Sequence, residues 1–305
     1  MMHKNILIQV FIVATVLSSL SSCKTKNKSN STNPSLITAE IKSLFNNQKE
    51  SNNRIEDSII LSTPNETSSA YQERNYEPYW INAEGLTNNG KSLINFVINA
   101  RNYGLIPEAY NVQKTTNQYN NLKIDTLWEN ARKNPKNWAR MDILLTDAFL
   151  SISRNLDLGY IPLDSLSKDK SYISSKYRKA LVKILDADNL IQILESFEPT
   201  TPSYKELKKH LPAFLSNTDF SKKLTFIDYP IKNQDKFINQ IIKRSKEENF
   251  LAQDVTTLDS VQLSTLIKKI QEKKNLEIDG KYGRQVIFAL NNTDQEKYFK
   301  IVVPL

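Results

Sequence analysis

Residues 134–159 read NPKNWARMDILLTDAFLSISRNLDLG. Asn134 can cap a helix with its side chain, and Pro135 can occupy the first turn because proline has no N–H to lose there. Apolar residues then recur at helical spacing until Gly159 interrupts the pattern. They are Met141, Leu145, Ala148, Phe149, Ile152 and Leu156. The stretch predicts one long helix whose apolar face packs against other elements.

The segments around this helix have helical patterns as well. Thr87 can cap a helix, Leu93 and Val97 lie on its apolar face, and Gly104 after Tyr103 is typical of a helix end. Further helices are predicted at residues 118–133, 172–186, 188–197 and 203–216. Only residues 223–231 have a strand-like pattern. We therefore predict a mainly α fold.

A second helical unit is expected after this segment. Its first helix has an apolar stripe that includes Phe237 and Ile241, and its second begins at Asp259 with Gln262 placed for a capping box. The connection to a third helix contains Asp279-Gly280, a tight turn in which glycine readily takes positive φ. The pattern predicts three short helices around one small core.

The N-terminus has the pattern of a secretory signal. An uncharged apolar run from Ile6 to Leu20 follows Lys4 and is shorter than the roughly 20 residues that a transmembrane helix needs. Leu20-Ser-Ser-Cys23 resembles the bacterial lipobox, which implies that residues 1–22 are removed and that Cys23 carries a lipid anchor. The alternative is an ordinary secretion signal that ends near a stray thiol.

The segment after the signal is expected to be a flexible tether over residues 23–69. Residues 24–34 are polar and have no apolar periodicity. Residues 36–48 have weak helical spacing, and residues 51–69 are again polar, so we expect this region to be partly ordered at best.

Composition limits the remaining possibilities. The chain has 305 residues, 39% of them hydrophobic, and a formal net charge of +8. It is long enough for two modest domains, and its one cysteine cannot pair internally. A positive charge suits an anionic partner, but no basic stripe interleaved with aromatic residues stands out, so no nucleic-acid partner is expected. No cofactor and no metal site is indicated.

The second unit resembles the peptidoglycan-binding domain, with its pattern "FQ … GL … DG … G … T … AL". The matching residues are Ile270-Gln271, Leu276, Asp279-Gly280, Tyr282-Gly283 and Ala289-Leu290. Ile270 replaces the usual Phe, Asn275 stands where Gly is common, and Gln285 or Val286 where Thr is usual. The resemblance implies a domain over residues 231–293 and peptidoglycan as the partner. Its candidate binding residues are Asp279, Gly280, Tyr282, Gly283 and Arg284, and Asp279-Gly280 is equally consistent with a turn alone.

The first unit resembles the helical scaffold domain of large L,D-transpeptidases. The resemblance is carried by residues 71–80, by 101–107 with Tyr110, by 144–149 with Gly159-Tyr160, and by 199–204 with Leu207 and Leu211. It implies a scaffold domain over residues 70–222, ahead of the peptidoglycan-binding unit as in that family.

The catalytic signature of that family, a His-Gly followed by Ser-x-Gly-Cys-x-Arg, does not occur in the sequence. Acyl transfer needs a thiolate, a base and an oxyanion site together. Cys23 is assigned to the anchor, and the histidines are His3, in the signal, and His210. Residues 294–305 resemble the start of the linker helix that precedes the catalytic domain, with Thr293 and Glu296 as its capping box.

Two functions follow as hypotheses. In the first, the chain is a membrane-anchored lipoprotein of the cell envelope, facing the periplasm, which binds or scaffolds peptidoglycan without chemistry of its own. In the second, it is part of a truncated or split L,D-transpeptidase that forms 3-3 crosslinks, with catalysis supplied beyond Leu305 or by a separate chain.

Other residues have side chains that are capable of catalysis or ligand binding. His210 lies beside Lys208 and Lys209 and is expected to be a surface side chain. Glu247-Glu248 and Asp57 are nominal glycosidase carboxylates, but that reaction needs two carboxyl groups about 5 to 10 Å apart across a cleft. Trp80, Trp128 and Trp138 could stack on sugars, although aromatic residues at helical spacing are more often core.

Overall fold

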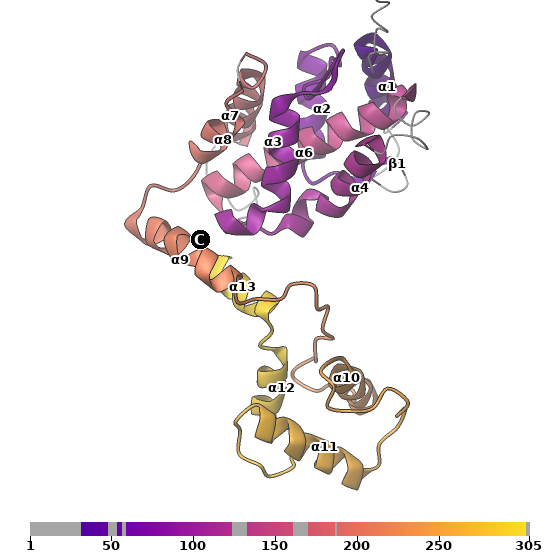
Figure 1. Ribbon diagram of the computed structural model, residues 1–305, viewed down its shortest axis with the longest axis vertical. Helices are drawn as coiled ribbons and strands as arrows, with labels where there is room; N and C mark the ends of the chain where they lie inside the picture. Colours follow the sequence, from indigo (N-terminus) through magenta and orange to yellow (C-terminus); the bar gives the residue numbers. More distant parts are fainter. Residues whose placement is uncertain are drawn as a thin grey trace, which may run out of the picture.

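The computed structural model describes residues 32–47, 54–56, 59–123, 133–160, 170–186 and 188–302. The described chain is mainly helical, which confirms the predicted fold class (Figure 1). The signal 1–22, Cys23, the predicted helix residues 124–132 and the end of the chain lie outside the described residues. The elements up to residue 215 are α1 (Pro34–Asn46), β1 (Arg54–Glu56), β2 (Ile59–Ile60), α2 (Pro64–Glu73), β3 (Ile81–Asn82), β4 (Gly85–Leu86), α3 (Asn88–Ile98), η2 (Ala100–Tyr103), η3 (Pro107–Tyr110), α4 (Val112–Lys123), α6 (Pro135–Leu158), α7 (Lys170–Lys183), α8 (Leu190–Glu195) and α9 (Pro202–Leu215).

Helix α6 is the centre of the first unit. Asn134 caps it by accepting a bond from the Lys136 N–H at 3.0 Å, Pro135 opens it, and Gly159 follows its last residue. It contacts α1, α2, α3, α4, α7 and α8. A helix that is buried on most of its circumference needs neighbours on every side, and this arrangement supplies them. The prediction made for residues 134–159 is confirmed.

Two carboxylates of α6 hold the surrounding backbone. Asp142 accepts bonds from the Tyr71 hydroxyl at 2.6 Å and from the N–H groups of Tyr79 and Trp80 at 2.9 and 2.8 Å. Burial raises the pKa of Asp142 to about 6, although these donors act in the opposite direction. The carboxylate therefore fixes the turn before β3 to the central helix.

Asp147, one turn further along α6, holds the start of α2. It accepts bonds from the N–H groups of Ser62 and Thr63 at 3.0 and 2.7 Å and from the Thr63 hydroxyl at 2.8 Å. Burial raises the pKa of Asp147 as well. Because Thr63 is the N-cap residue of α2, Asp147 accepts from the N-cap N–H as the N3 side chain of a capping box would, and it fixes the point at which the chain enters the helix.

The expectation of a partly ordered tether up to residue 69 is wrong for the described part of it. Asn33 caps α1, and α1 buries Ile37, Ile41, Leu44 and Phe45 in the core of the first unit. These four residues repeat at helical spacing, and contact with α6 gives the short helix the partner that an isolated helix lacks. The first unit therefore begins well before residue 70.

Two short antiparallel hairpins complete the first unit. Strand β1 pairs with β2, and β3 pairs with β4, with Ile81 opposite Leu86 and Asn82 opposite Gly85. Thr87 caps α3 by accepting a bond from the Gly90 N–H at 3.1 Å, as expected. The helix ends at Ile98 rather than Tyr103, and a separate 3-10 turn, η2, leads to Gly104 at φ 71°. Helix α4 begins at Val112, earlier than predicted.

The strand predicted at residues 223–231 is not formed. Side chains of the second unit take up the hydrogen-bonding groups of this backbone. The Ile227 N–H and C=O pair with the Asn291 amide at 2.9 and 2.8 Å, and the Thr225 N–H donates to Glu247. A segment whose polar groups are satisfied in this way has no need of a neighbouring strand. The segment is therefore held as a loop.

The second unit contains α10 (Gln234–Glu247), α11 (Ser260–Lys273) and α12 (Arg284–Asn291). Its apolar core is separate from that of the first unit and includes Phe237, Ile241, Ile267, Ile270 and Ile287. Asp259 and Gln262 form the predicted capping box. The predicted three-helix arrangement is confirmed, and Figure 1 shows it apart from the larger helical unit.

Helix α13 (Asp294–Val302) returns the chain to the first unit. It lies beside α9, where Tyr298 and Val302 pack with Leu211 (Figure 1). The Tyr298 hydroxyl donates to the carbonyl oxygen of Leu105 at 2.7 Å. Thr293 caps the helix through the Glu296 N–H at 3.1 Å. The second unit is thus joined to the first at both of its ends.

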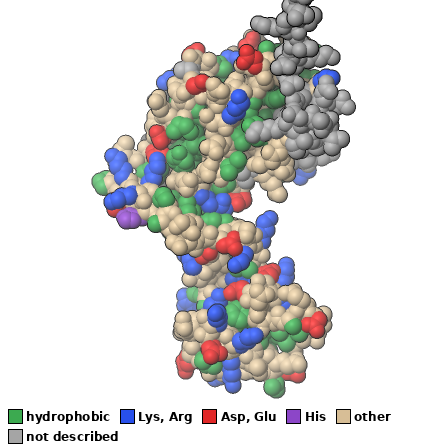
Figure 2. Space-filling view, in the orientation of Figure 1, with side chains coloured by type: hydrophobic (Ala, Val, Ile, Leu, Met, Phe, Trp, Pro, Cys, Tyr) green, Lys and Arg blue, Asp and Glu red, His purple; other side chains and the backbone are tan. Residues whose placement is uncertain are grey.

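Among the described residues, no helix is both long enough and apolar enough to cross a membrane. Acidic and basic side chains are interspersed over the face of the molecule that Figure 2 shows.

Candidate functional site

The loop between α11 and α12 is organised by one buried side chain, that of Gln271. Its Nε2 donates to Asp279 Oδ1 at 2.7 Å and to the Lys281 carbonyl oxygen at 3.2 Å, and its Oε1 accepts from the Gly280 N–H at 2.9 Å. The amide therefore satisfies both a donor and two acceptors of the turn. Gln271 was part of the sequence pattern, but its role as the centre of the loop depends on contacts that the pattern does not contain.

Asp279 and Gly280 are the turn itself. Asp279 is exposed and also accepts from the Lys281 N–H at 2.8 Å, and these bonds, led by that from Gln271, lower its pKa. Gly280 has φ 72°, and a Cβ there would lie 2.5 Å from Ser264 Oγ. Only glycine meets both requirements. The contacts of this pair are those of a turn, so the remaining candidates for contact with a ligand are the residues that follow it.

Gly283 and Tyr282 have different surroundings. Gly283 has no positive φ, and a Cβ there would meet nothing within 4 Å, so open space lies beside the start of α12. Tyr282 packs its ring on Phe237, with centroids 4.8 Å apart, and its hydroxyl accepts from Gln234 Nε2 at 2.6 Å. Tyr282 therefore joins the loop to α10.

Arg284 leads from the loop to an exposed group of aromatic side chains. Its guanidinium lies over the Phe288 ring at 4.9 Å, and Phe288 meets Tyr229 edge to face with centroids 5.6 Å apart. We call Phe226, Tyr229 and Phe288 the aromatic patch; their exposed fractions are 54%, 47% and 47%. The sequence gives no signal for this patch, because its residues belong to segments that are distant in sequence and carry no motif.

A pocket of about 420 Å³ lies against the patch. Phe226 and Tyr229 contribute to its wall, and so does Phe237, the residue on which Tyr282 packs. The other lining residues are Asp228, Pro230, Ile231, Lys232, Asn233, Lys236 and Gln240. Tyr282 contacts the pocket wall through Phe237, and Arg284 is linked to it through Phe288 and Tyr229, whereas Asp279 and Gly280 shape the loop.

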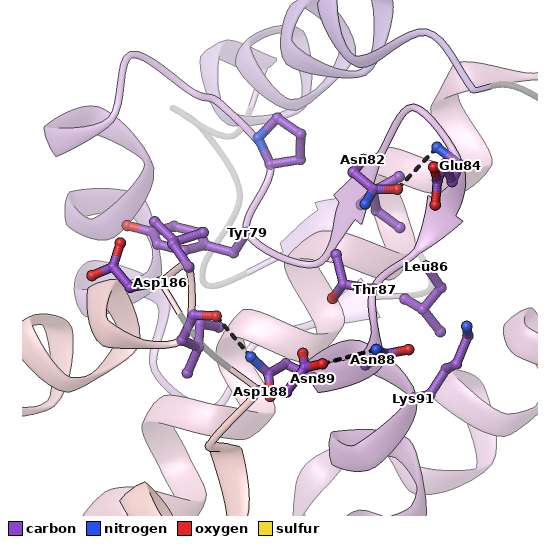
Figure 3. A pocket seen from close by; sticks show the side chains of 14 residues that line it. Tyr79, Asn82, Glu84, Leu86, Thr87, Asn88, Asn89, Lys91, Asp186 and Asp188 are labelled. Atoms are coloured by element: carbon purple, nitrogen blue, oxygen red, sulfur yellow. Dashed lines mark hydrogen bonds between the residues drawn. The ribbon is translucent and has the colours of Figure 1, made fainter.

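A second pocket, of about 660 Å³, lies in the first unit between the β3–β4 hairpin and residues 184–188 (Figure 3). Asn88 Nδ2 donates to Asp188 Oδ2 at 2.8 Å, and Asn89 Nδ2 donates to the Ile184 carbonyl oxygen at 2.7 Å. These amides connect the walls of the pocket. Its described lining contains no cysteine, serine or histidine.

The remaining chemical candidates are engaged elsewhere. His210 is exposed and contacts Glu206 at 2.9 Å. Glu247 binds the Thr225 N–H and hydroxyl, and Glu248 forms ion pairs with Arg244 and Lys274, each at 2.7 Å. Burial opposes ionisation of Glu248, but the two cations lower its pKa. These carboxylates have structural partners rather than a shared cleft.

The tryptophans of the described chain are core residues. Trp80 and Trp138 are buried, and Trp80 Nε1 donates to the Thr146 hydroxyl at 2.9 Å. Trp128 and Asp57 lie outside the described residues. Within the described ranges, no group of three His, Cys, Asp or Glu side chains is arranged to hold a metal ion.

Comparison with known protein families identifies part of the first unit. Residues 65–211 match the family model of the Scaffold domain. This scaffold domain runs from the start of α2 into α9 and includes the central helix α6. It does not reach the three-helix unit, the aromatic patch or the loop at residues 279–284. No curated protein and no solved structure matches the chain.

Proposed function

We propose that this chain is a lipoprotein of the cell envelope that binds peptidoglycan without catalysing a reaction itself, as the scaffold and peptidoglycan-binding parts of an L,D-transpeptidase would. The observation that carries the proposal is the loop held by Gln271. Its amide contacts Asp279, Gly280 and Lys281 and thereby gives a structural reason for the glutamine and the Asp-Gly pair of the peptidoglycan-binding pattern.

The order of the two units supports the proposal. The scaffold domain at residues 65–211 precedes a separate three-helix core, which is the order that the resemblance to large L,D-transpeptidases implies. Both ends of the three-helix unit are joined to the scaffold domain through α9 and α13. Such a double connection would hold a wall-binding unit at a defined distance from the helical body.

Binding to purified sacculi tests the proposal. The purified full chain, kept in detergent, should sediment with sacculi and stay in the supernatant without them. A chain that stays wholly in the supernatant in both cases would refute peptidoglycan binding.

The proposed anchor is a lipid on Cys23, with the chain facing the periplasm. Multiple acyl chains hold a protein stably on a membrane, whereas one chain binds only marginally. Mass spectrometry of the mature N-terminus should find a modified Cys23. An unmodified N-terminal residue other than Cys23 would overturn the anchor and leave the binding proposal standing.

A second candidate function is that of a part of an L,D-transpeptidase whose catalytic cysteine lies elsewhere. The match to the Scaffold domain favours it. A reading frame next to the codon for Leu305 that encodes Ser-x-Gly-Cys-x-Arg would support it. The first candidate predicts that the purified chain alone forms no crosslinked dimers from tetrapeptide stems, and the appearance of such dimers would refute that prediction.

A further inference from the structure

The aromatic patch is an apolar surface that the fold of the second unit does not require. Tyr229 and Phe288 each leave about half of their surface in contact with solvent, although the core of the same unit buries other large side chains completely. Clustered exposed apolar residues, unlike scattered ones, mark sites at which a ligand or partner covers them. Tyr229 and Phe288 contact each other edge to face, so the two rings form one continuous apolar surface.

Polar groups surround the patch on two sides. On one side, the Arg284 guanidinium covers part of the Phe288 ring. On the other, the pocket presents Asp228, Lys236 and Gln240, and Lys236 forms an ion pair with Asp228 at 2.5 Å. Lys232, also in the pocket wall, makes no ion pair among the described residues. Phe226 and Tyr229 thus lie beside hydrogen-bonding groups in one pocket wall, and Phe288 adjoins that wall through Tyr229.

We propose that the aromatic patch and its pocket bind the glycan strand of peptidoglycan, with a sugar ring stacked on Tyr229 or Phe288. The inference rests on the proposed function and assigns the wall moiety that is bound. A sugar ring has an apolar face of C–H groups and a polar edge of hydroxyl and acetamido groups, and the patch and the pocket wall match these two surfaces. The pocket volume of about 420 Å³ lies within the range of small-molecule sites, roughly 300–1,000 Å³.

The alternative occupants fit the surface less well. A stem peptide of small residues offers carboxylates to Arg284 and Lys232 but no flat apolar face for two exposed aromatic rings. A second copy of the chain would need a much larger apolar area, because stable interfaces bury roughly 800 Å² on each partner. The glycan strand uses both the rings and the polar edge, and it is the occupant to which the proposal commits.

The test compares three probes and three forms of the full chain in detergent. The probes are intact sacculi, soluble glycan strands freed of stem peptides by an amidase, and free stem tetrapeptide. The forms are the wild type, the double variant Tyr229→Ala/Phe288→Ala, and the control Val261→Ala. Val261 is an exposed apolar residue of the same unit, with an exposed fraction of 76%, and it does not line the pocket.

We expect the wild type and Val261→Ala to bind glycan strands equally in titration calorimetry. The double variant should bind at least tenfold more weakly, as expected for the loss of two contact aromatic residues. Its circular dichroism spectrum and thermal transition should match those of the wild type, because both rings are half exposed.

Four outcomes would overturn the inference. Wild type that binds sacculi and stem peptide but not glycan strands would assign the peptide as ligand and leave the proposed function intact. Equal binding of glycan by the wild type and the folded double variant would remove the patch from the site. Self-association that the double variant abolishes, without glycan binding, would assign the surface to a second copy. Wild type that binds none of the probes would refute the proposed function together with this inference.

Discussion

Replacement of Gly280 by alanine tests the geometry of the loop at residues 279–284. A residue other than glycine at φ 72° costs about 1–2 kcal/mol in backbone strain. The new Cβ would lie 2.5 Å from Ser264 Oγ and 2.8 Å from Lys268 Cε, so both side chains must move. Movement of Ser264 breaks its bond to the Gly280 carbonyl oxygen, which contributes about 1 kcal/mol. We expect Gly280→Ala to destabilise this segment by about 2–3 kcal/mol.

Hydrogen exchange measured by mass spectrometry gives the local readout that this prediction needs. Peptides from α11 and α12 should exchange roughly 30-fold faster or more in Gly280→Ala, since each 1.4 kcal/mol of opening free energy is a factor of about ten. Peptides from α6 should be unchanged. Gly283→Ala is the matched control, because a Cβ there meets nothing and the loss of glycine as N-cap costs about 1 kcal/mol at most. Equal exchange in the two variants would refute the assigned roles of both glycines.

Three further perturbations follow from the buried contacts. Gln271→Leu leaves the buried Gly280 N–H without its acceptor and should destabilise the second unit by about 1–3 kcal/mol. The same substitution should raise the pKa of Asp279 toward its ordinary value in an NMR titration. An unchanged pKa would contradict the hydrogen bond between Gln271 and Asp279. Ile37→Ala should lower the free energy of unfolding by about 2–5 kcal/mol in urea denaturation, whereas Leu36→Ala, at the exposed neighbouring position, should change it little. Equal small effects of the two substitutions would show that α1 is not packed in the core. The pKa of Asp142 in the folded state is raised to about 6, so the wild type loses stability as the pH rises from about 4 to above 6 and this carboxyl group ionises. Asp142→Asn cannot ionise, so its deficit in unfolding free energy relative to the wild type should shrink by up to about 3 kcal/mol over that range. A deficit that grows instead would show that the pKa of Asp142 is lowered in the folded state.

Local signals in the sequence predicted the helices whose ends carry their own caps. Asn134 and Gly159 bound α6, and Asp259 with Gln262 begins α11, because capping depends on residues within one turn of each other. Helix α1 was underestimated for the opposite reason. Its four buried residues have the correct spacing, but the helix is stabilised by contact with α6, which lies about a hundred residues further along the chain.

The site was predictable only in part. The Asp279-Gly280 turn follows from local chemistry, and the structure confirms the positive φ of Gly280. The aromatic patch joins Tyr229 to Phe288, and no local pattern connects an irregular loop to a helix face that follows it by more than fifty residues. The loop character of residues 223–231 has the same origin, because the side chains that satisfy its backbone come from α10 and α12.

Peptidoglycan binding is tested most directly by a binding isotherm of the full chain on purified sacculi. We expect saturable depletion of the chain from the supernatant as sacculi are added, and release of the bound chain by an excess of soluble wall fragments. A chain that remains in the supernatant at every concentration of sacculi would show that the proposed peptidoglycan binding is wrong.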